Sequence, residues 1–358
     1  MSVKLLFPQL ITSTRIRGFS RGWHAAGRAL TFSKKTLHAF LEPGEAYSAL
    51  IDPILDRLGA AYDVQVKRYR VSTPEKSAAP EPEKLSAYGP LDAARLAEAF
   101  GLDVPAADYD PGDLPNGDNL RKKWGHYGSG MIYFEGEWFW GLDRIHHLET
   151  RLGAAEPIFM PIAEPDTAKG GEFEMFYSFR SPYSYLAVMR VFELARCWNA
   201  TVKLRPVLPM VMRALPVPWP KRFYILRDTL REAERYELPF GKICDPVGPG
   251  IERGLAILVK EIEAGRGEVL SQAFLRGVFA EGLDAATDKG LQEICLKGGV
   301  SWADAKAAMA DESWRDVVEA NRQELFAHGH WGVPTFKVGD NWTFGQDRLW
   351  QVGRWLGG

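Results

Sequence analysis

Apolar residues change their spacing along the chain, and these changes predict a block of strands and helices in the C-terminal half. Aromatic or alternating runs indicate strands, whereas apolar residues three or four positions apart indicate helices. In chain order the block is predicted as strand 173–178, helix 181–198, strand 201–208, helices at about 221–236, 251–264, 267–281, 286–297, 301–309 and 311–327, strands 334–338 and 341–344, and helix 346–356. This order is typical of an α/β domain with an all-helical insertion at about 210–327.

The N-terminal half repeats this order in a shorter form. It is predicted as strand 37–41, helix 46–60, strand 64–71, loop 72–87, helix 90–100, hairpin 130–140 and helix 142–152. Both halves place strand, helix and strand before a hairpin and a final helix, which is a thioredoxin-like arrangement. We therefore expect an α/β protein with two thioredoxin-like domains, of which only the second carries the full helical insertion.

Residue identities indicate a tandem duplication. Residues 124–153 align without a gap with residues 328–357, and residues 40–67 align with residues 176–203 at a smaller offset. The change of offset means that the first copy lacks much of the helical block, at about residues 106–123. A repeat of this kind defines the domain count.

The domain boundaries follow from composition. Residues 156–172 are rich in Pro, Gly and charge, which is typical of a linker. We predict a first domain at 1–155 with a basic N-terminal extension, a linker at 156–172 and a second domain at 173–358. A short linker keeps the copies at high effective concentration, so we expect an internal pseudo-dimer, with further homo-oligomerisation as an open alternative.

The first 41 residues contain no Asp or Glu. Their basic residues are Lys4, Arg15, Arg17, Arg21, Arg28, Lys34 and Lys35. We favour a basic helix or arm packed on the first domain, because the segment lacks a clear amphipathic stripe. An organellar transit peptide is the alternative.

Composition limits the classes of partner. The chain of 358 residues is 46% hydrophobic with a net charge of −2, which does not favour nucleic acid. No apolar run is long enough to span a bilayer, and we expect no membrane partner. The three cysteines, Cys197, Cys244 and Cys295, form no C-x-x-C motif and are typical of a reducing compartment. We therefore expect a cytoplasmic location.

Ser181 is the first candidate for chemistry, because it lies where a predicted strand ends and a helix begins. Such a junction presents unpaired backbone N–H groups and the positive end of the helix dipole, so it stabilises an anion such as a thiolate. A hydroxyl there can donate one more hydrogen bond. The structural alternative is a plain helix N-cap.

Three motifs carry a family resemblance. FYSFRSPYSYLA (176–187), GVPTF (332–336) and FGQDR (344–348) resemble the 2-hydroxychromene-2-carboxylate isomerases and kappa-class glutathione transferases, which belong to the DsbA-like branch of the thioredoxin fold. Disulfide oxidoreductases of this fold place C-x-x-C where this chain has Ser181 and Ser184. The resemblance therefore implies a glutathione-dependent enzyme that is not a dithiol oxidoreductase.

The resemblance also implies roles for individual residues. Ser181 would hydrogen-bond the glutathione sulfur, and the backbone of Val333, before a cis Pro334, would pair with the cysteinyl part. The turn that follows the hairpin would hold the γ-glutamyl end, with Asp347 facing its ammonium group; its residues are Phe344, Gly345, Gln346 and Asp347. Structural alternatives are a turn proline for Pro334 and a helix N-terminal acid for Asp347.

Arg213 and Lys221 are candidates for binding a substrate carboxylate. Lys221 matches the lysine of the kappa-class enzymes by its spacing to Tyr224 and Asp228, and Arg213 lies where the isomerases carry a substrate-contacting lysine. Plain surface charge is the alternative for both. The residue upstream of Lys221 departs from the kappa-class pattern, which carries an asparagine there.

The first copy lacks the residues that the chemistry requires. Glu45 faces Ser181 and Gly130 faces Pro334, and a carboxylate at the sulfur position would repel a thiolate. We interpret this copy as degenerate and structural. We also expect no metal site, because His126 and His330 occupy paired repeat positions and have no ligand partners at suitable spacing.

The function predicted from the sequence is a glutathione-dependent isomerase or transferase acting on an aromatic or conjugated small molecule. Glutathione is the expected cofactor. The alternative is a non-catalytic thioredoxin-like module that binds a thiol or a protein.

Overall fold

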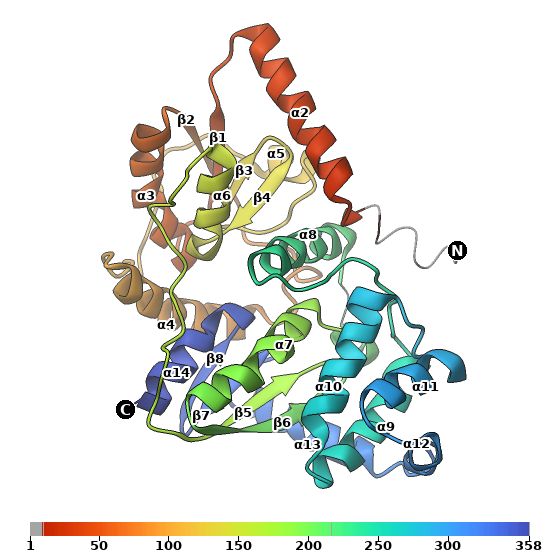
Figure 1. Ribbon diagram of the computed structural model, residues 1–358. Coiled ribbons are helices and arrows are strands. Elements are labelled where there is room, and N and C mark those ends of the chain that lie inside the picture. Colours follow the sequence, from red (N-terminus) through yellow and green to blue (C-terminus); the bar gives the residue numbers. More distant parts are fainter. Residues whose placement is uncertain (1–8, 10, 216, 358) are drawn as a thin grey trace. The chain divides into compact units, whose positions relative to one another are not determined.

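The computed structural model describes residues 9, 11–215 and 217–357 and divides the chain into two compact units (Figure 1). The C-terminal unit comprises Ala163–Pro216 and Ile225–Gly358, together with Met1–Ser13. The N-terminal unit comprises Thr14–Ile162 and Val217–Tyr224. The change of unit at Ala163 falls inside the stretch 156–172 that was expected to be the linker.

The C-terminal unit contains a four-stranded sheet in the order β6-β5-β7-β8. The strands are β5 (Gly171–Tyr177), β6 (Ala200–Pro206), β7 (Thr335–Val338) and β8 (Asn341–Phe344). β5 runs parallel to β6 and antiparallel to β7, and β7 and β8 form the predicted hairpin. Because β5 and β7 are neighbours, the sheet brings together segments that are far apart in sequence.

Helices make up the rest of this unit. They are α7 (Pro182–Cys197), the short turn η2 (Met210–Arg213), α8 (Trp219–Arg235, whose first turns count with the N-terminal unit), α9 (Pro249–Glu263), α10 (Gly267–Arg276), the π-helical turn η3 (Gly277–Glu281), α11 (Asp288–Lys297), α12 (Trp302–Met309), α13 (Trp314–Ala327), η4 (Gln346–Arg348) and α14 (Leu349–Gly357). The all-helical insertion is thus present. The helix predicted over 267–281 differs, since its last turn is a π-helix.

Alternate residues of β5 face opposite sides of the sheet, as the two-residue period of a strand requires. Met175 and Tyr177 are fully buried in the main core together with residues of α7 and α14. Phe176 points the other way and packs with Leu325 of α13 and Trp342 of β8. Helices therefore cover both faces of the sheet and hold the end of β5, where Ser181 follows, in a fixed position.

The N-terminal unit has a sheet of the same design, in the order β2-β1-β3-β4. Its strands are β1 (Thr36–Leu41), β2 (Gln65–Arg70), β3 (Met131–Phe134) and β4 (Glu137–Trp140), with the same parallel and antiparallel pairings as in the other unit. Its helices are α2 (Thr14–Thr31), α3 (Ala46–Tyr62), α4 (Pro82–Phe100), α5 (Asp118–Lys123), η1 (Leu142–Arg144) and α6 (Ile145–Leu152). Duplication and an internal pseudo-dimer stay predictions.

Two expectations for this unit were wrong. α4 begins at Pro82, inside the expected loop 72–87. Proline is well tolerated in the first turn of a helix, so Pro82 does not prevent a helix from starting there. The N-terminal segment does have an amphipathic stripe: Ile16, Phe19, Trp23 and Leu30 share one side of α2. Three intervening glycines obscure that stripe in the sequence.

Within the described part of the chain, none of the helices combines the length and apolarity needed to cross a membrane.

Candidate functional site

Ser181 lies at the N-terminus of α7 and makes two hydrogen bonds through its hydroxyl. The Oγ atom accepts from the backbone N–H of Ser184 at 3.1 Å, which is an N-cap. The same hydroxyl donates to the backbone carbonyl of Val333 at 3.2 Å. Ser181 therefore caps its own helix and also reaches the loop before β7, which lies far away in sequence.

The loop before β7 contains the predicted cis peptide bond, between Val333 and Pro334. Two hydrogen bonds hold the loop: Thr335 Oγ1 donates to the carbonyl of Gly332 at 2.9 Å, and the N–H of Gly345 donates to the carbonyl of Pro334 at 2.9 Å. The structure thereby places Ser181, Val333, Pro334 and Gly345 in one hydrogen-bonded neighbourhood.

Aromatic side chains form one wall beside this loop. The ring of Phe344 stacks on that of Trp331, with centroids 6.0 Å apart. Gly332 lies against Phe344 so closely that an added Cβ atom would come within 2.6 Å of the ring. A larger residue at position 332 would therefore displace the Phe344 ring. The sequence identified Phe344 but not Trp331.

The turn after β8 differs in detail from expectation. Gln346 is buried, and its amide accepts from Arg190 at 3.0 Å and donates to Glu232 at 2.8 Å. Its side chain is thus engaged inside the unit, and only its backbone is offered to a ligand. The carboxylate of Asp347 lies 3.2 Å from the guanidinium of Arg348 and is partly exposed.

The two candidate cations are placed differently. Arg213 lies in η2, where its guanidinium donates to the carbonyl of Trp331 at 3.3 Å and sits 5.5 Å from the ring centroid of Phe326. It therefore belongs to the neighbourhood of Val333. Lys221 counts with the N-terminal unit, donates to the carbonyl of Ala78 at 2.8 Å, and has its pKa lowered to about 8 by burial. The structure does not bring Lys221 into the group around Ser181.

A buried polar group on α8 went unnoticed in the sequence. Asp228 is fully buried, and it accepts from the hydroxyl of Tyr183 at 2.8 Å and from the guanidinium of Arg231 at 2.9 Å. Tyr183 stands between the two serines of the S-P-Y-S motif. Charged residues at helical spacing from 228 to 235 were the available signal, but a solvent-exposed helix face has the same pattern.

The equivalent position in the N-terminal unit is filled by a carboxylate. Glu45 caps α3 and accepts from the backbone N–H groups of Tyr47 at 3.0 Å and Ser48 at 2.6 Å, and from the Ser48 hydroxyl at 2.7 Å. An added Cβ atom on Gly130 would lie 3.2 Å from the same carboxylate. Burial raises the pKa of the Glu45 carboxyl, and its three hydrogen bonds oppose this rise. The N-terminal unit thus fills this position with its own carboxylate.

This burial makes the stability of the N-terminal unit depend on pH. A carboxyl whose pKa is raised on folding favours the folded state at acidic pH, and this contribution is lost as the pH rises through the raised value. Ser at position 45 would keep the cap without the buried charge. We therefore expect Glu45→Ser to gain thermal stability relative to the wild type as the pH rises above about 4, the ordinary pKa of a glutamate.

The matched control is Glu319→Ser in α13. Arg322 holds the pKa of Glu319 down to about 2, so this carboxylate contributes stability that is present near neutral pH and lost in acid. Glu319→Ser should therefore lose stability relative to the wild type as the pH rises from about 2 to about 4, and the difference should stay constant at higher pH. Parallel trends for the two variants in a calorimetric pH series would contradict the prediction.

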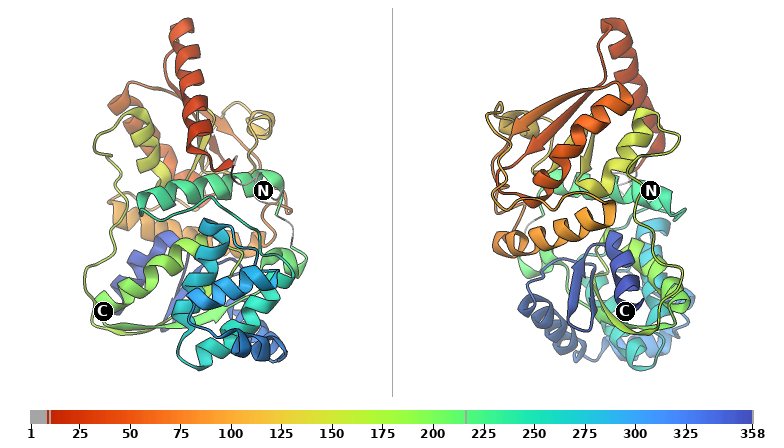
Figure 2. Two further views of the ribbon diagram at one scale, coloured as in Figure 1. Left: turned by 45° about the vertical axis from the view of Figure 1, so that its right-hand side comes forward. Right: turned by 90° about the vertical axis from the view of Figure 1, so that its left-hand side faces the viewer.

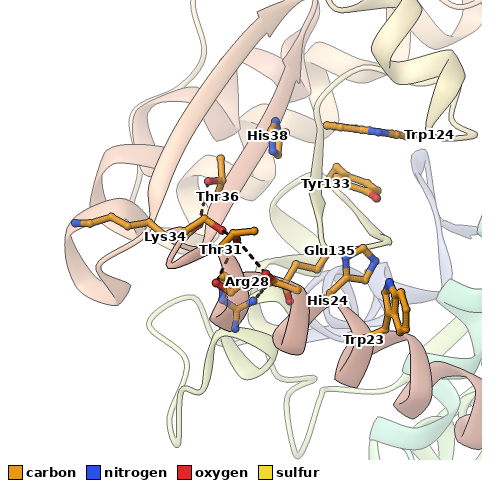
Figure 3. Close-up of a pocket in the computed structure, with 12 residues that line it drawn as sticks. Trp23, His24, Arg28, Thr31, Lys34, Thr36, His38, Trp124, Tyr133 and Glu135 are labelled. Carbon is orange, nitrogen blue, oxygen red and sulfur yellow. Dashed lines mark hydrogen bonds and ion pairs between the residues drawn. The ribbon is translucent and has the colours of Figure 1, made fainter.

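A separate hollow of about 450 Å³ in the N-terminal unit contains none of the predicted site residues (Figure 3). Its walls include Trp23, His38, Trp124 and Tyr133. Trp124 stacks on Tyr133 with ring centroids 4.2 Å apart. Burial lowers the pKa of His38 to about 4, so its imidazole is neutral near neutral pH.

The paired histidines make the contacts of core residues. His126 is buried, accepts from the N–H of Gly128 at 3.0 Å and stacks on Tyr127. Burial lowers its pKa to about 3. His330 is likewise buried and stacks on Trp342.

The chain has been compared with known proteins. Residues 172–356 match the DSBA-like thioredoxin domain. No curated protein sequence matches this chain. Solved structures with a similar fold include a 2-hydroxychromene-2-carboxylate isomerase, with 19% identity and a TM-score of 0.44 over 51% of this chain and 92% of that chain. They also include a probable DsbA oxidoreductase from Streptomyces coelicolor, with 22% identity and a TM-score of 0.41 over 52% and 89%. A third is the cytosolic disulfide reductase DsbM from Pseudomonas aeruginosa, with 20% identity and a TM-score of 0.40 over 52% and 95%.

Proposed function

Because the chain belongs to the DSBA-like thioredoxin domain family, we propose that its C-terminal unit binds glutathione and uses it to isomerise or conjugate an aromatic or conjugated small molecule. The observation that carries this proposal is Ser181. Its hydroxyl lies at the N-terminus of α7 and reaches the carbonyl of Val333, beside the cis peptide bond. Neither Ser181 nor Ser184 can form a disulfide, so dithiol exchange lacks its nucleophile at these positions.

The residues around Ser181 fit a bound thiolate with one rearrangement. The hydroxyl has a single proton, which it donates to Val333 in this structure. To stabilise a sulfur anion, the hydroxyl must turn that proton from the Val333 carbonyl toward the sulfur, while the oxygen still accepts from Ser184. The dipole of α7 favours a negative charge at the same place. Bound glutathione would supply the nucleophilic sulfur there.

The remaining groups would hold the tripeptide. The backbone of Val333 would pair with its central residue in the manner of an added strand. The Asp347 carboxylate would attract the α-ammonium group, and Gln346 would act through its backbone since its amide is already engaged. Arg213, which contacts Trp331, would bind a carboxylate of glutathione or of the second substrate.

The non-catalytic alternative has one observation in its favour. Ser181 already donates one hydrogen bond and accepts another within the protein, as a purely structural cap would. A thiol- or protein-binding module would need no change at Ser181. A measurement of turnover separates the two functions.

We expect the full-length protein to bind one glutathione per chain and to convert 2-hydroxychromene-2-carboxylate. One site is expected because Glu45 occupies the equivalent position in the first copy. Titration calorimetry measures the stoichiometry, and the absorbance change of the substrate measures turnover with glutathione at substoichiometric concentration. Repeated turnover identifies an isomerase, and consumption of one thiol per product identifies a transferase.

Three outcomes would overturn the proposal. Two equal glutathione sites would show that the first copy is intact. Binding without turnover of either kind would favour the non-catalytic module. Reduction of a protein disulfide by the full chain would identify dithiol chemistry that Ser181 and Ser184 cannot perform. A reducing compartment such as the cytoplasm, which we propose as the location, would supply reduced glutathione.

A further inference from the structure

Helix α2 exposes its apolar side. The exposed fractions are 49% for Ile16, 75% for Phe19, 73% for Trp23 and 81% for Leu30, and Phe32, just beyond the helix, is 96% exposed. These five side chains are hereafter called the apolar strip. The first four follow one side of a helix about 27 Å long, and Phe32 lies just past its C-terminal end. The described residues of the N-terminal unit leave much of the surface of these side chains uncovered, and α2 lies at the edge of that unit (Figure 2). A surface helix normally buries such a stripe against its own core.

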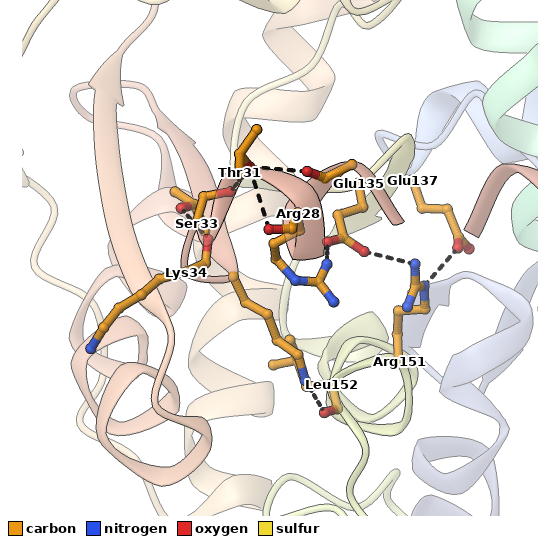
Figure 4. Close-up of polar contacts among 11 residues, drawn as sticks. Arg28, Thr31, Ser33, Lys34, Glu135, Glu137, Arg151 and Leu152 are labelled. Carbon is orange, nitrogen blue, oxygen red and sulfur yellow. Dashed lines mark hydrogen bonds and ion pairs between the residues drawn. The ribbon is translucent and has the colours of Figure 1, made fainter. Parts of the chain in front are cut away.

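Ion pairs on the opposite side of α2 hold the helix in this orientation (Figure 4). Arg21 donates two hydrogen bonds to Glu137, at 2.6 and 2.9 Å, and Arg28 pairs with Glu135. Arg151 of α6 joins both carboxylates, at 2.9 Å from Glu135 and 3.3 Å from Glu137. Both carboxylates belong to the β3–β4 hairpin or its turn and are largely buried. The charged side of the helix is therefore turned inward and the apolar strip outward.

The charge around the apolar strip is positive. No acidic residue occurs among the first 41 residues. Arg15 is exposed near one end of the strip. Beyond the other end, Lys34 has 70% of its side chain exposed and pairs with the exposed carboxylate of Asp63 at 3.3 Å. Lys35 donates to a backbone carbonyl of Leu152. Even the inward cluster carries three arginines against two carboxylates. A binding partner that matches both the exposed apolar side chains and the positive charge has an apolar interior and an anionic surface.

We propose that the apolar strip of α2 docks this protein onto the surface of an anionic lipid bilayer. Trp, Phe and Leu side chains would enter the boundary between headgroups and acyl chains, while Arg15 and Lys34 would contact lipid phosphates. This inference departs from the expectation of no membrane partner, which considered only apolar runs long enough to span a bilayer. It concerns α2 alone and does not depend on the proposed catalytic function.

Other occupants fit the strip less well. A second copy paired through α2 would bring two sets of basic residues together, and one helix face is small compared with the roughly 1,200 Å² that stable protein interfaces bury. A protein partner would require shape complementarity and hydrogen-bonding groups. The strip instead presents large apolar side chains separated by glycine and alanine, which a fluid surface accommodates without a fixed complementary shape.

The proposal is tested by sedimentation of the full-length protein with phosphatidylcholine vesicles, with and without phosphatidylglycerol. We expect binding to the anionic vesicles that weakens as salt rises. Phe19→Ser and Trp23→Ser should each weaken it by about tenfold or more, because each removes a large side chain from the lipid. Both residues lie outside the core, so circular dichroism should show an unchanged fold.

The matched control is Leu296→Ser in α11. Leu296 is 77% exposed but lies outside the apolar strip, so this variant should bind vesicles as the wild type does. Absence of wild-type binding, equal binding to uncharged vesicles, or equal weakening by Leu296→Ser would overturn the proposal. So would a dimer in solution that Phe19→Ser dissociates, because the strip would then be a contact between copies.

Discussion

Replacing Ser181 with alanine is expected to lower glutathione-dependent turnover by about 10- to 150-fold and to raise the pKa of the bound thiol. The variant removes one hydrogen bond to an anionic sulfur, and a bond to a charged group contributes about 1.5–3 kcal/mol. The Ser181 hydroxyl is the donor that the proposed function assigns to this sulfur. Ultraviolet titration of the bound thiolate, alongside turnover, measures both effects.

The matched control is Ser301→Ala. Ser301 caps α12 by accepting from the N–H of Asp304 at 3.1 Å, the same distance as in the Ser181 cap. Both variants therefore lose an N-cap, which costs about 1 kcal/mol of stability. Only Ser181→Ala should change the thiol pKa and the turnover. If both variants merely lower the thermal midpoint, Ser181 is a structural cap and the non-catalytic module becomes the better function.

The second large effect is expected at the buried pair on α8. Arg231→Met should lower the free energy of unfolding by about 3–5 kcal/mol, because it removes a cation paired with the fully buried carboxylate of Asp228. The hydrogen bond from the Tyr183 hydroxyl supplies no opposite charge. Denaturant unfolding of the variant and the wild type measures the difference.

Two further variants separate this effect from general loss of charge. Arg196→Met removes an ion pair with Glu268 that is largely exposed. This variant should therefore lose less than about 1 kcal/mol in its free energy of unfolding. The double variant Asp228→Leu/Arg231→Met removes both charges and should recover part of the stability lost in the single variant. If the double variant is less stable than Arg231→Met, the unpaired charge of Asp228 is not the cause of the loss, and the prediction is wrong.

Local patterns in the sequence were sufficient for most elements of the two sheets. Strands and helices follow from the spacing of apolar residues, and that spacing is set by the two-residue period of a strand and the 3.6-residue period of a helix. The strand-to-helix junction that holds Ser181 could be located for the same reason. The sequence motifs also indicated the family and the cis bond before Pro334, both of which the comparisons or the structure confirm.

Only the tertiary structure could decide whether a given polar side chain faces the solvent or the interior. The sequence placed Gln346 in the ligand-binding turn, but buried partners on two other helices, Arg190 and Glu232, engage its amide. The charged residues of α8 look like a solvent-exposed face in the sequence, yet Asp228 is fully buried. Gln346 lies more than a hundred positions from both partners, and Tyr183, which donates to Asp228, lies 45 positions from it, so no local pattern encodes these contacts.

Helix α2 illustrates the same limit in reverse. Its amphipathic pattern fits equally well with burial of the apolar side or of the charged side, because helical periodicity specifies two faces but not their orientation. Glu135 and Glu137, more than a hundred residues away, determine the outcome through their ion pairs with Arg28 and Arg21. The sequence predicted only a basic helix or arm in the first 41 residues, and long-range ion pairs decided that the apolar face of α2 lies in the solvent.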